Sequence, residues 1–144
     1  MTNLDALRHD HEVLRRVGEA LEHTLAASAS SAVTCQLCAT LVRLLEQHLQ
    51  REQAALAPHA QRLQVVLHHQ CCSDHADPRV VLRDLRWLLA PEACGCSAAG
   101  MVHLHRLLEE LREEFAEEER EVFPLVESAH IGAPAWSDGL KKAW

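Results

Sequence analysis

The chain has 144 residues, of which 48% are hydrophobic but only 3% aromatic, with no tyrosine and five glycines. This length suits one domain that buries a core without cross-links, and a core built mainly from leucine, valine and alanine favours an all-α fold. The formal charge of −7 opposes binding to nucleic acid or to anionic membrane surfaces. No apolar run approaches the ~20 residues that a membrane helix needs, and no segment resembles a signal peptide, so we expect a soluble, cytoplasmic protein.

The first predicted helix begins at Thr2 or Asn3, either of which is a suitable N-cap, with Asp5 in its first turn. Its apolar residues recur at steps of three and four, in a stripe that a histidine interrupts once. The stripe consists of Leu4, Leu7, His11, Leu14, Gly18, Leu21 and Leu25. His11 is therefore expected to point into the core, and the Ala/Ser-rich stretch 26–32 predicts a loop.

The second predicted helix begins near Ser31 or Thr34 and runs to about His69. Its inward stripe consists of Leu41, Leu45, His48, Glu52, Leu56, His59, Leu63 and Leu67. His48 and Glu52 thus stand one turn apart among leucines. Pro58 falls inside this helix and is expected to kink it, because proline removes a backbone hydrogen bond.

The third predicted helix starts at Pro78, because Asp77-Pro78 has the pattern of an N-cap followed by proline at the first helical position. A start at Ser73 or Asp74 is the alternative. The apolar stripe consists of Leu82, Leu85 and Leu89. Extending it backwards by one heptad reaches His75, and the stretch 91–97 ends the helix.

The fourth predicted helix runs from about Ser97 to Glu127, and two carboxylates, Glu114 and Glu118, occupy core positions in it. The full stripe is Leu104, Leu107, Leu111, Glu114, Glu118, Val122 and Leu125. The neighbouring acids predict a solvated face; they are Glu113, Glu117, Glu119 and Glu121. We expect an up-down-up-down four-helix bundle over residues 1–128 and a C-terminal tail over residues 129–144.

In such a bundle, inward side chains at mid-height converge on one centre. The candidates are His11, His48, Glu52, Glu114 and Glu118. Burying an unpaired ionised carboxylate costs many kcal/mol, and a bound metal is the compensation that fits these residue types. Imidazole with carboxylate suits iron or manganese, and also zinc. The alternative is a bundle whose inward polar groups are hydrated or paired with one another.

Three segments resemble the hemerythrin-like (HHE) cation-binding domain family, over about residues 4–126. They are Asp10-His11-Glu12-Val13-Leu14-Arg15, His48-x-x-x-Glu52 followed by Pro58, and Glu117-Glu118-Glu119-Arg120-Glu121-Val122-Phe123-Pro124. The resemblance implies a four-helix bundle holding a non-haem di-iron site, with dioxygen, nitric oxide or peroxide as reactants. The roles it implies are oxygen binding, sensing, iron storage or handling, detoxification, or repair of iron centres. It makes His11, His48, Glu52 and Glu118 ligands.

The chain departs from the family pattern at two positions. Glu114 stands where the family has a histidine, and the histidine of the third helix corresponds either to His75 by spacing or to Leu82 by the leucine pattern. A carboxylate at position 114 favours the ferric state, which shifts the expectation from reversible oxygen carriage toward oxidase, peroxidase or iron-handling chemistry. Whether the protein is an enzyme stays open.

The six cysteines support a different class of function. Cys35-x-x-Cys38 and Cys94-x-Cys96 lie at the same end of an up-down bundle, where four thiolates could bind zinc or copper(I); Cys71-Cys72, beside His68-His69, could form a second soft site. The alternatives are therefore a zinc or copper buffer, a redox sensor, or a metal-free helical adaptor whose tail docks a partner through Trp136 and Trp144. His59 is interpreted as a core histidine or one that supports the metal ligands. The other histidines of the helices, His9, His23, His103 and His105, are expected at the surface.

Overall fold

A computed structural model describes residues 2–27, 31–59, 78–89 and 98–131 of the chain, and these ranges are helical, without a strand, except for the capping residues Thr2 and Ala27. The helices are α1 (Asn3–Ala26), α2 (Ser31–Leu56), α4 (Pro78–Leu89), α5 (Ala98–Glu117) and α6 (Phe123–Ile131). A 3₁₀ turn, η1 (Ala57–His59), follows α2, and a π-helical turn, η2 (Glu118–Val122), joins α5 to α6. The prediction of an all-α fold is confirmed.

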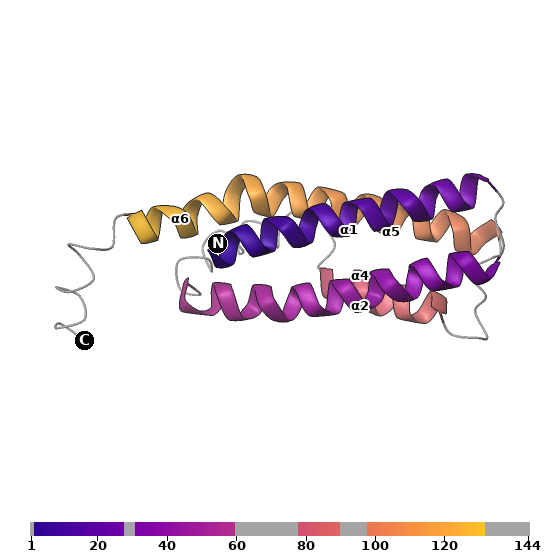
Figure 1. Ribbon diagram of the computed structural model, residues 1–144, viewed down its shortest axis with the longest axis horizontal. Helices are drawn as coiled ribbons and strands as arrows, with labels where there is room; N and C mark the ends of the chain where they lie inside the picture. Colours follow the sequence, from indigo (N-terminus) through magenta and orange to yellow (C-terminus); the bar gives the residue numbers. More distant parts are fainter. Residues whose placement is uncertain (1, 28–30, 60–77, 90–97, 132–144) are drawn as a thin grey trace.

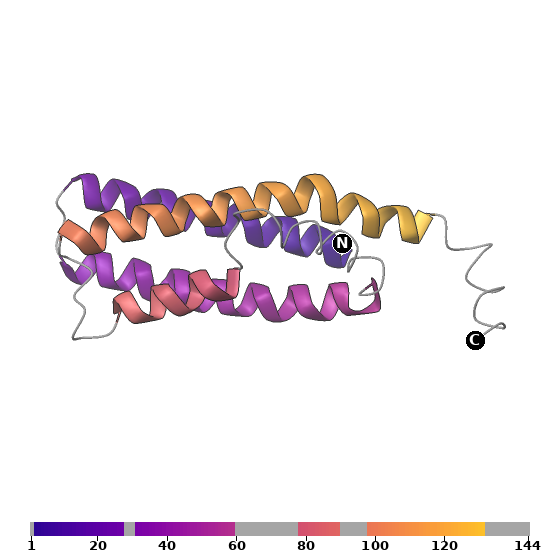
Figure 2. The same ribbon diagram turned by 180° about the vertical axis from the view of Figure 1, so that it is seen from behind.

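The helices lie side by side along the long axis of an elongated bundle (Figures 1 and 2). α1 packs against α2 and α5, and α4 packs against the same two helices from the other side. The segments α5, η2 and α6 follow one another as a single long rod (Figure 1). Within the described ranges, no helix combines the length and the apolar character needed to cross a lipid bilayer.

The predicted ends of the helices agree with the structure in part. Thr2 is the N-cap of α1: its hydroxyl accepts a hydrogen bond from the Asp5 backbone N–H at 3.1 Å, and the Asp5 carboxylate accepts one from the Thr2 N–H at 3.0 Å. The prediction that the second helix continues past Pro58 with a kink is wrong there, because α2 ends at Leu56 and Pro58 lies in a 3₁₀ turn. Proline has no N–H to extend the α-helical ladder and disfavours the α conformation of the residue before it.

Some predicted boundaries fall outside the described residues. The expected continuation of the second helix to His69 and the alternative start of the third helix at Ser73 or Asp74 belong to this group. Of the predicted tail over residues 129–144, residues 129–131 are helical and belong to α6, and the rest lies outside the described residues. The described part of the third helix, α4, begins at Pro78. α6 ends at Ile131.

The buried apolar residues form two clusters. The larger one joins α1, α2, α4 and α5, and includes Leu14, Leu45, Leu85, Leu111 and Phe115. The smaller one joins the start of α1 to η2 and α6, and consists of Leu4, Leu7, Val122, Phe123 and Val126. Buried polar side chains lie between them, because His11 falls between Leu7 and Leu14, and Glu118 falls between Phe115 and Val122.

The π-helical turn η2 explains one error in the predicted core. Its wide turn is closed by a hydrogen bond from the Phe123 backbone N–H to the Glu118 carbonyl, five residues apart. The extra residue in this turn advances the buried face by one position. Val122, Phe123 and Val126 are buried, whereas Leu125, which a regular helical stripe places in the core, is 40% exposed.

Candidate metal centre

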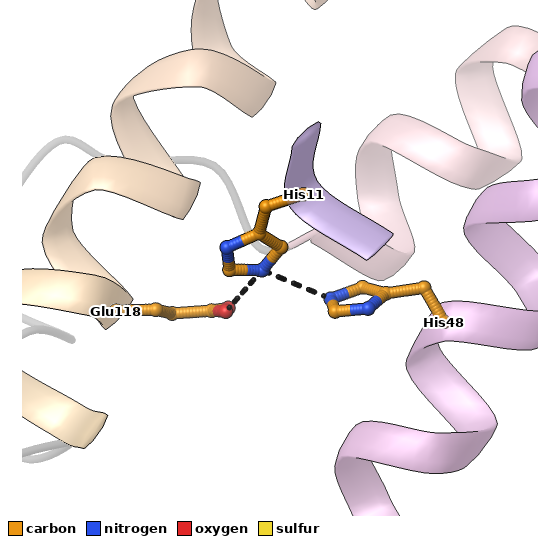
Figure 3. Close-up of side chains that lie close together, drawn as sticks. All are labelled: His11, His48 and Glu118. Carbon is orange, nitrogen blue, oxygen red and sulfur yellow. Dashed lines mark hydrogen bonds and ion pairs between the residues drawn. The ribbon is translucent and has the colours of Figure 1, made fainter. Parts of the chain in front are cut away.

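Three buried side chains from three elements meet between the two apolar clusters. His11 comes from α1, His48 from α2 and Glu118 from the first position of η2, and their exposed fractions are 0%, 0% and 4%. Figure 3 shows the side chains pointing at one another, with His11 in the middle. The His11 Nε2 atom lies 3.2 Å from His48 Nε2 and 3.2 Å from Glu118 Oε2. One ligand atom from each residue lies within 4.8 Å of the others, a spacing that one metal ion can bridge.

Glu52 adds a second carboxylate to this group. It follows His48 by one turn of α2, and its Oε2 atom lies 3.4 Å from His48 Nε2. Among the buried side-chain atoms of the described residues, two lack a hydrogen-bond partner: Glu52 Oε2 and Glu118 Oε2. A buried carboxylate oxygen without a donor is costly. Two such oxygens beside two imidazole nitrogens form a donor set that fits a cation such as iron, manganese or zinc.

The ionised form of Glu118 is unfavourable in this site when no cation is present. Burial, followed by the negative charges of Glu52 and Glu114, raises the pKa of Glu118 well above its ordinary value. The metal-free protein therefore retains a proton on this carboxyl at a pH where an exposed glutamate is ionised. A metal ion would supply the positive charge that the carboxylates otherwise lack.

His11 is held as a neutral imidazole. Burial, together with the neighbouring His48, lowers its pKa to about 4, even though the hydrogen bond and charge of Glu119 act in the opposite direction. Since a metal binds the unprotonated nitrogen of a neutral imidazole, His11 is ready to act as a ligand at neutral pH.

Each histidine also contacts a carboxylate through its other ring nitrogen. His11 Nδ1 lies 3.0 Å from Glu119 Oε1, and Arg15 binds both oxygens of Glu119 at 3.0 and 2.9 Å. Burial opposes ionisation of Glu119, but the hydrogen bonds from Arg15 and His11 outweigh it and lower the pKa of this carboxyl.

A similar arrangement surrounds the second histidine. His48 Nδ1 lies 3.2 Å from Asp10 Oδ2, and Arg51 binds the two oxygens of Asp10 at 2.9 and 2.7 Å. Asp10 itself is largely shielded, with a side-chain exposure of 13%. Both pairs join different helices, because Asp10 and Arg15 belong to α1, Arg51 to α2 and Glu119 to η2.

Sequence reasoning missed these four outer residues. The prediction that Glu117 and Glu119 belong to a solvated face is wrong: Glu117 is buried and Glu119 binds His11 and Arg15. A regular stripe has no place for two adjacent inward glutamates, whereas the wide turn of η2 brings both Glu118 and Glu119 to the His11 ring. Two of the four could have been suspected from the sequence, because each is adjacent to a predicted ligand: Asp10 precedes His11, and Glu119 follows Glu118.

Aromatic rings from the two apolar clusters pack on the ring of His11. Phe115 stacks on His11 with ring centroids 4.2 Å apart and an interplanar angle of 16°, and Phe123 lies parallel to it at 5.5 Å. Both phenylalanines are fully buried. They hold the imidazole plane and keep water away from the ring.

The remaining predicted site residues are not part of this group. Glu114 lies one turn before Glu118 and is close enough for its charge to act on that carboxyl, but it is not one of the three residues whose ligand atoms converge. His75 lies outside the described residues. His59 is partly buried in η1.

The predicted cysteine sites are described only in part. Cys35 is exposed and Cys38 is buried near the start of α2. The other four cysteines and His68-His69 lie outside the described residues, as do Trp136 and Trp144.

Comparison of the chain with known proteins found no relative. No protein-family model, no curated protein and no solved structure matches the chain. Functional conclusions therefore depend on the residues and their geometry.

Deletion of Arg120 tests the role of the π-helical turn. Arg120 is exposed and lies inside η2, so its removal is expected to let α5 continue into α6 as a regular α-helix while the faces on either side stay in register. Glu118 and Glu119 then cannot both reach His11, and we expect metal affinity to fall by about tenfold or more with helical content unchanged. Circular dichroism and zinc titration measure the two quantities.

The variant Arg120→Ala is the matched control, because it removes the same side chain and keeps the length of the turn. It should bind metal as the native chain does. Equal metal affinity of the deletion and the control would show that the wide turn is not needed for the centre.

Proposed function

We propose that this chain is a non-haem iron-binding helical bundle of the hemerythrin-like kind, whose centre handles dioxygen, nitric oxide, peroxide or iron itself. His11, His48, Glu52 and Glu118 would hold the metal. The up-down-up-down helix order and the hemerythrin-like character belong to this proposal, and so does the assignment of iron over manganese or zinc.

The observation that carries the proposal is the convergence of four acceptor atoms in the core. Two imidazole Nε2 atoms and two carboxylate oxygens lie 3.2 to 3.4 Å from their neighbours, and the two oxygens have no hydrogen-bond partner among the described residues. Bundles that fold for stability alone fill such positions with apolar side chains. Retaining buried acids in them is costly, and a metal site accounts for that cost.

Iron bound there would supply redox capacity and Lewis acidity toward a small oxidant. The protein's part is to fix the ligands and to exclude water. Phe115 and Phe123 pack against His11, and apolar clusters close the core above and below the donor set. Such an enclosed donor set suits small reactants better than a large substrate.

The number of metals is part of the proposal. Among the described residues, the converging ligand atoms form one group, which suits one ion. The second ion of a dinuclear centre would take Glu114 and His75, and His75 lies outside the described residues. A carboxylate at position 114 would favour the ferric state of that second ion.

Elemental analysis of protein purified without oxygen, followed by ultraviolet-visible spectra before and after exposure to air, tests the proposal. We expect one iron per chain, or two if the second position is also filled, and ligand-to-metal charge-transfer absorption that appears when air is admitted. Zinc or copper with thiolate absorption would instead favour the cysteine-based buffer or redox sensor. A folded protein that takes up no metal would favour the helical adaptor.

A further inference from the structure

We propose that Asp10 and Glu119 are positioning residues that hold His48 and His11 with the ring hydrogen on Nδ1, so that both Nε2 atoms present lone pairs to the metal. The inference deepens the proposed function and rests on the metal site. It assigns different roles to two adjacent residues: Glu118 binds the metal, whereas Glu119 orients His11.

The hydrogen-bond chemistry of the outer carboxylates supports this assignment. An ionised carboxylate only accepts hydrogen bonds, so the contacts of 3.0 Å from His11 Nδ1 to Glu119 and 3.2 Å from His48 Nδ1 to Asp10 require a hydrogen on each Nδ1. In a neutral imidazole the other nitrogen then carries a lone pair. The opposite tautomer would place a lone pair against a carboxylate oxygen in the core.

Two arginines fix the carboxylates themselves. Arg15 donates two hydrogen bonds to Glu119, and Arg51 donates two to Asp10. Bidentate pairing of this kind sets the plane of the carboxylate as well as its position. Each histidine ring is thus held by a partner that is itself held at both oxygens.

The contacts between these carboxylates and histidines connect η2 to α1 and α1 to α2. η2 supplies Glu119 to orient His11 on α1, and α1 supplies Asp10 to orient His48 on α2. The two arginines connect the same pairs of elements: Arg15 of α1 binds Glu119 of η2, and Arg51 of α2 binds Asp10 of α1. Each ligand is therefore aligned by a neighbouring element and not by its own, so that packing of α1, α2 and η2 sets the alignment of both imidazoles.

The variants Asp10→Asn and Glu119→Gln test the inference. An amide can either accept from Nδ1–H or donate to a bare Nδ1, so each variant permits both tautomers at nearly unchanged shape. In metal-free protein at neutral pH, nitrogen-15 NMR of the imidazole rings should show a hydrogen on Nδ1 of both His11 and His48 in the native chain, whereas the two facing Nε2 atoms, 3.2 Å apart, can share a further hydrogen. Glu119→Gln should add a form without the Nδ1 hydrogen at His11 alone, and Asp10→Asn should add such a form at His48 alone.

Metal affinity gives the second readout. Loss of an outer partner of a metal-binding histidine typically weakens binding by about 10 to 100-fold, and we expect that range for Fe²⁺ and for Zn²⁺ with either variant. The matched controls are Glu12→Gln and Glu121→Gln, which remove a charge from exposed positions on α1 and η2. They should leave both the tautomers and the affinity unchanged.

The outcomes separate this inference from the proposed function. A native chain in which either ring lacks the hydrogen on Nδ1, or variants that keep native tautomers and native affinity, would overturn the positioning role, and the first of these needs no variant to fold. A native chain with the expected tautomers that binds neither Fe²⁺ nor Zn²⁺ would overturn the proposed metal function and still support the positioning of the rings.

Discussion

Replacing Glu118 with glutamine is expected to stabilise the metal-free protein and to weaken metal binding at least about a hundredfold. The two effects have opposite signs because the same carboxyl is costly to the apo fold and necessary for the metal. Residues that serve function at the expense of stability show this combination. No purely structural role of Glu118 predicts it.

The gain in stability follows from the raised pKa of Glu118. A carboxyl whose pKa is higher in the folded state binds its proton more tightly there, so the free energy of unfolding falls as pH rises from the ordinary glutamate range toward the folded pKa. Glutamine does not titrate, and its amide can donate to the lone pair of His11 Nε2. We expect Glu118→Gln to raise the free energy of unfolding by about 1 kcal/mol at neutral pH and to have little effect near pH 4.

Urea unfolding of metal-free protein at both pH values, together with zinc titration, measures the two effects. Glu109→Gln is the matched control, since it removes a charge from an exposed position of α5 and should change neither quantity by much. Glu118→Gln with native affinity for metal would exclude this carboxylate as a ligand. A loss of stability at neutral pH would mean that Glu118 is paired favourably in the apo protein.

The helical periodicity of the sequence was sufficient to predict three of the residues that converge. His11, His48 and Glu118 lie on stripes of leucine at steps of three and four, and all three are buried. The prediction works because a side chain flanked by buried neighbours one turn before and after has no other direction available. Glu52 lies at the same kind of position and is mostly buried, with a side-chain exposure of 17%.

The parts that sequence reasoning missed depend on geometry that a regular stripe does not contain. A stripe assumes 3.6 residues per turn, so the wide turn of η2 moved the buried face from Leu125 to Val126 and turned Glu119 inward. Asp10, Arg15 and Arg51 were missed for a second reason: their partners lie on other helices. The pairing of charged side chains on different helices depends on how each helix is rotated about its axis and shifted along it. Neither quantity can be read from the sequence of one helix.

The double variant His48→Ala/Glu52→Ala is expected to lose metal binding, with affinity lowered at least about a thousandfold for Fe²⁺ and for Zn²⁺. It removes two of the four proposed ligands and both members of the pair on α2. The helix should persist, because alanine has the highest helix propensity. Elemental analysis after loading and dialysis measures the bound metal, and circular dichroism reports the fold.

The chain contains its own matched control for this experiment. His105 and Glu109 form the same four-residue pair on α5, but both are exposed, so His105→Ala/Glu109→Ala removes the same chemical groups from a solvated face. Histidine and glutamate one turn apart are common on helices, and only their burial opposite His11 and Glu118 distinguishes the pair on α2. If both double variants retain the metal content of the native chain, the centre lies elsewhere; if only the α2 variant loses its metal, convergence in the core, and not the sequence pair, creates the site.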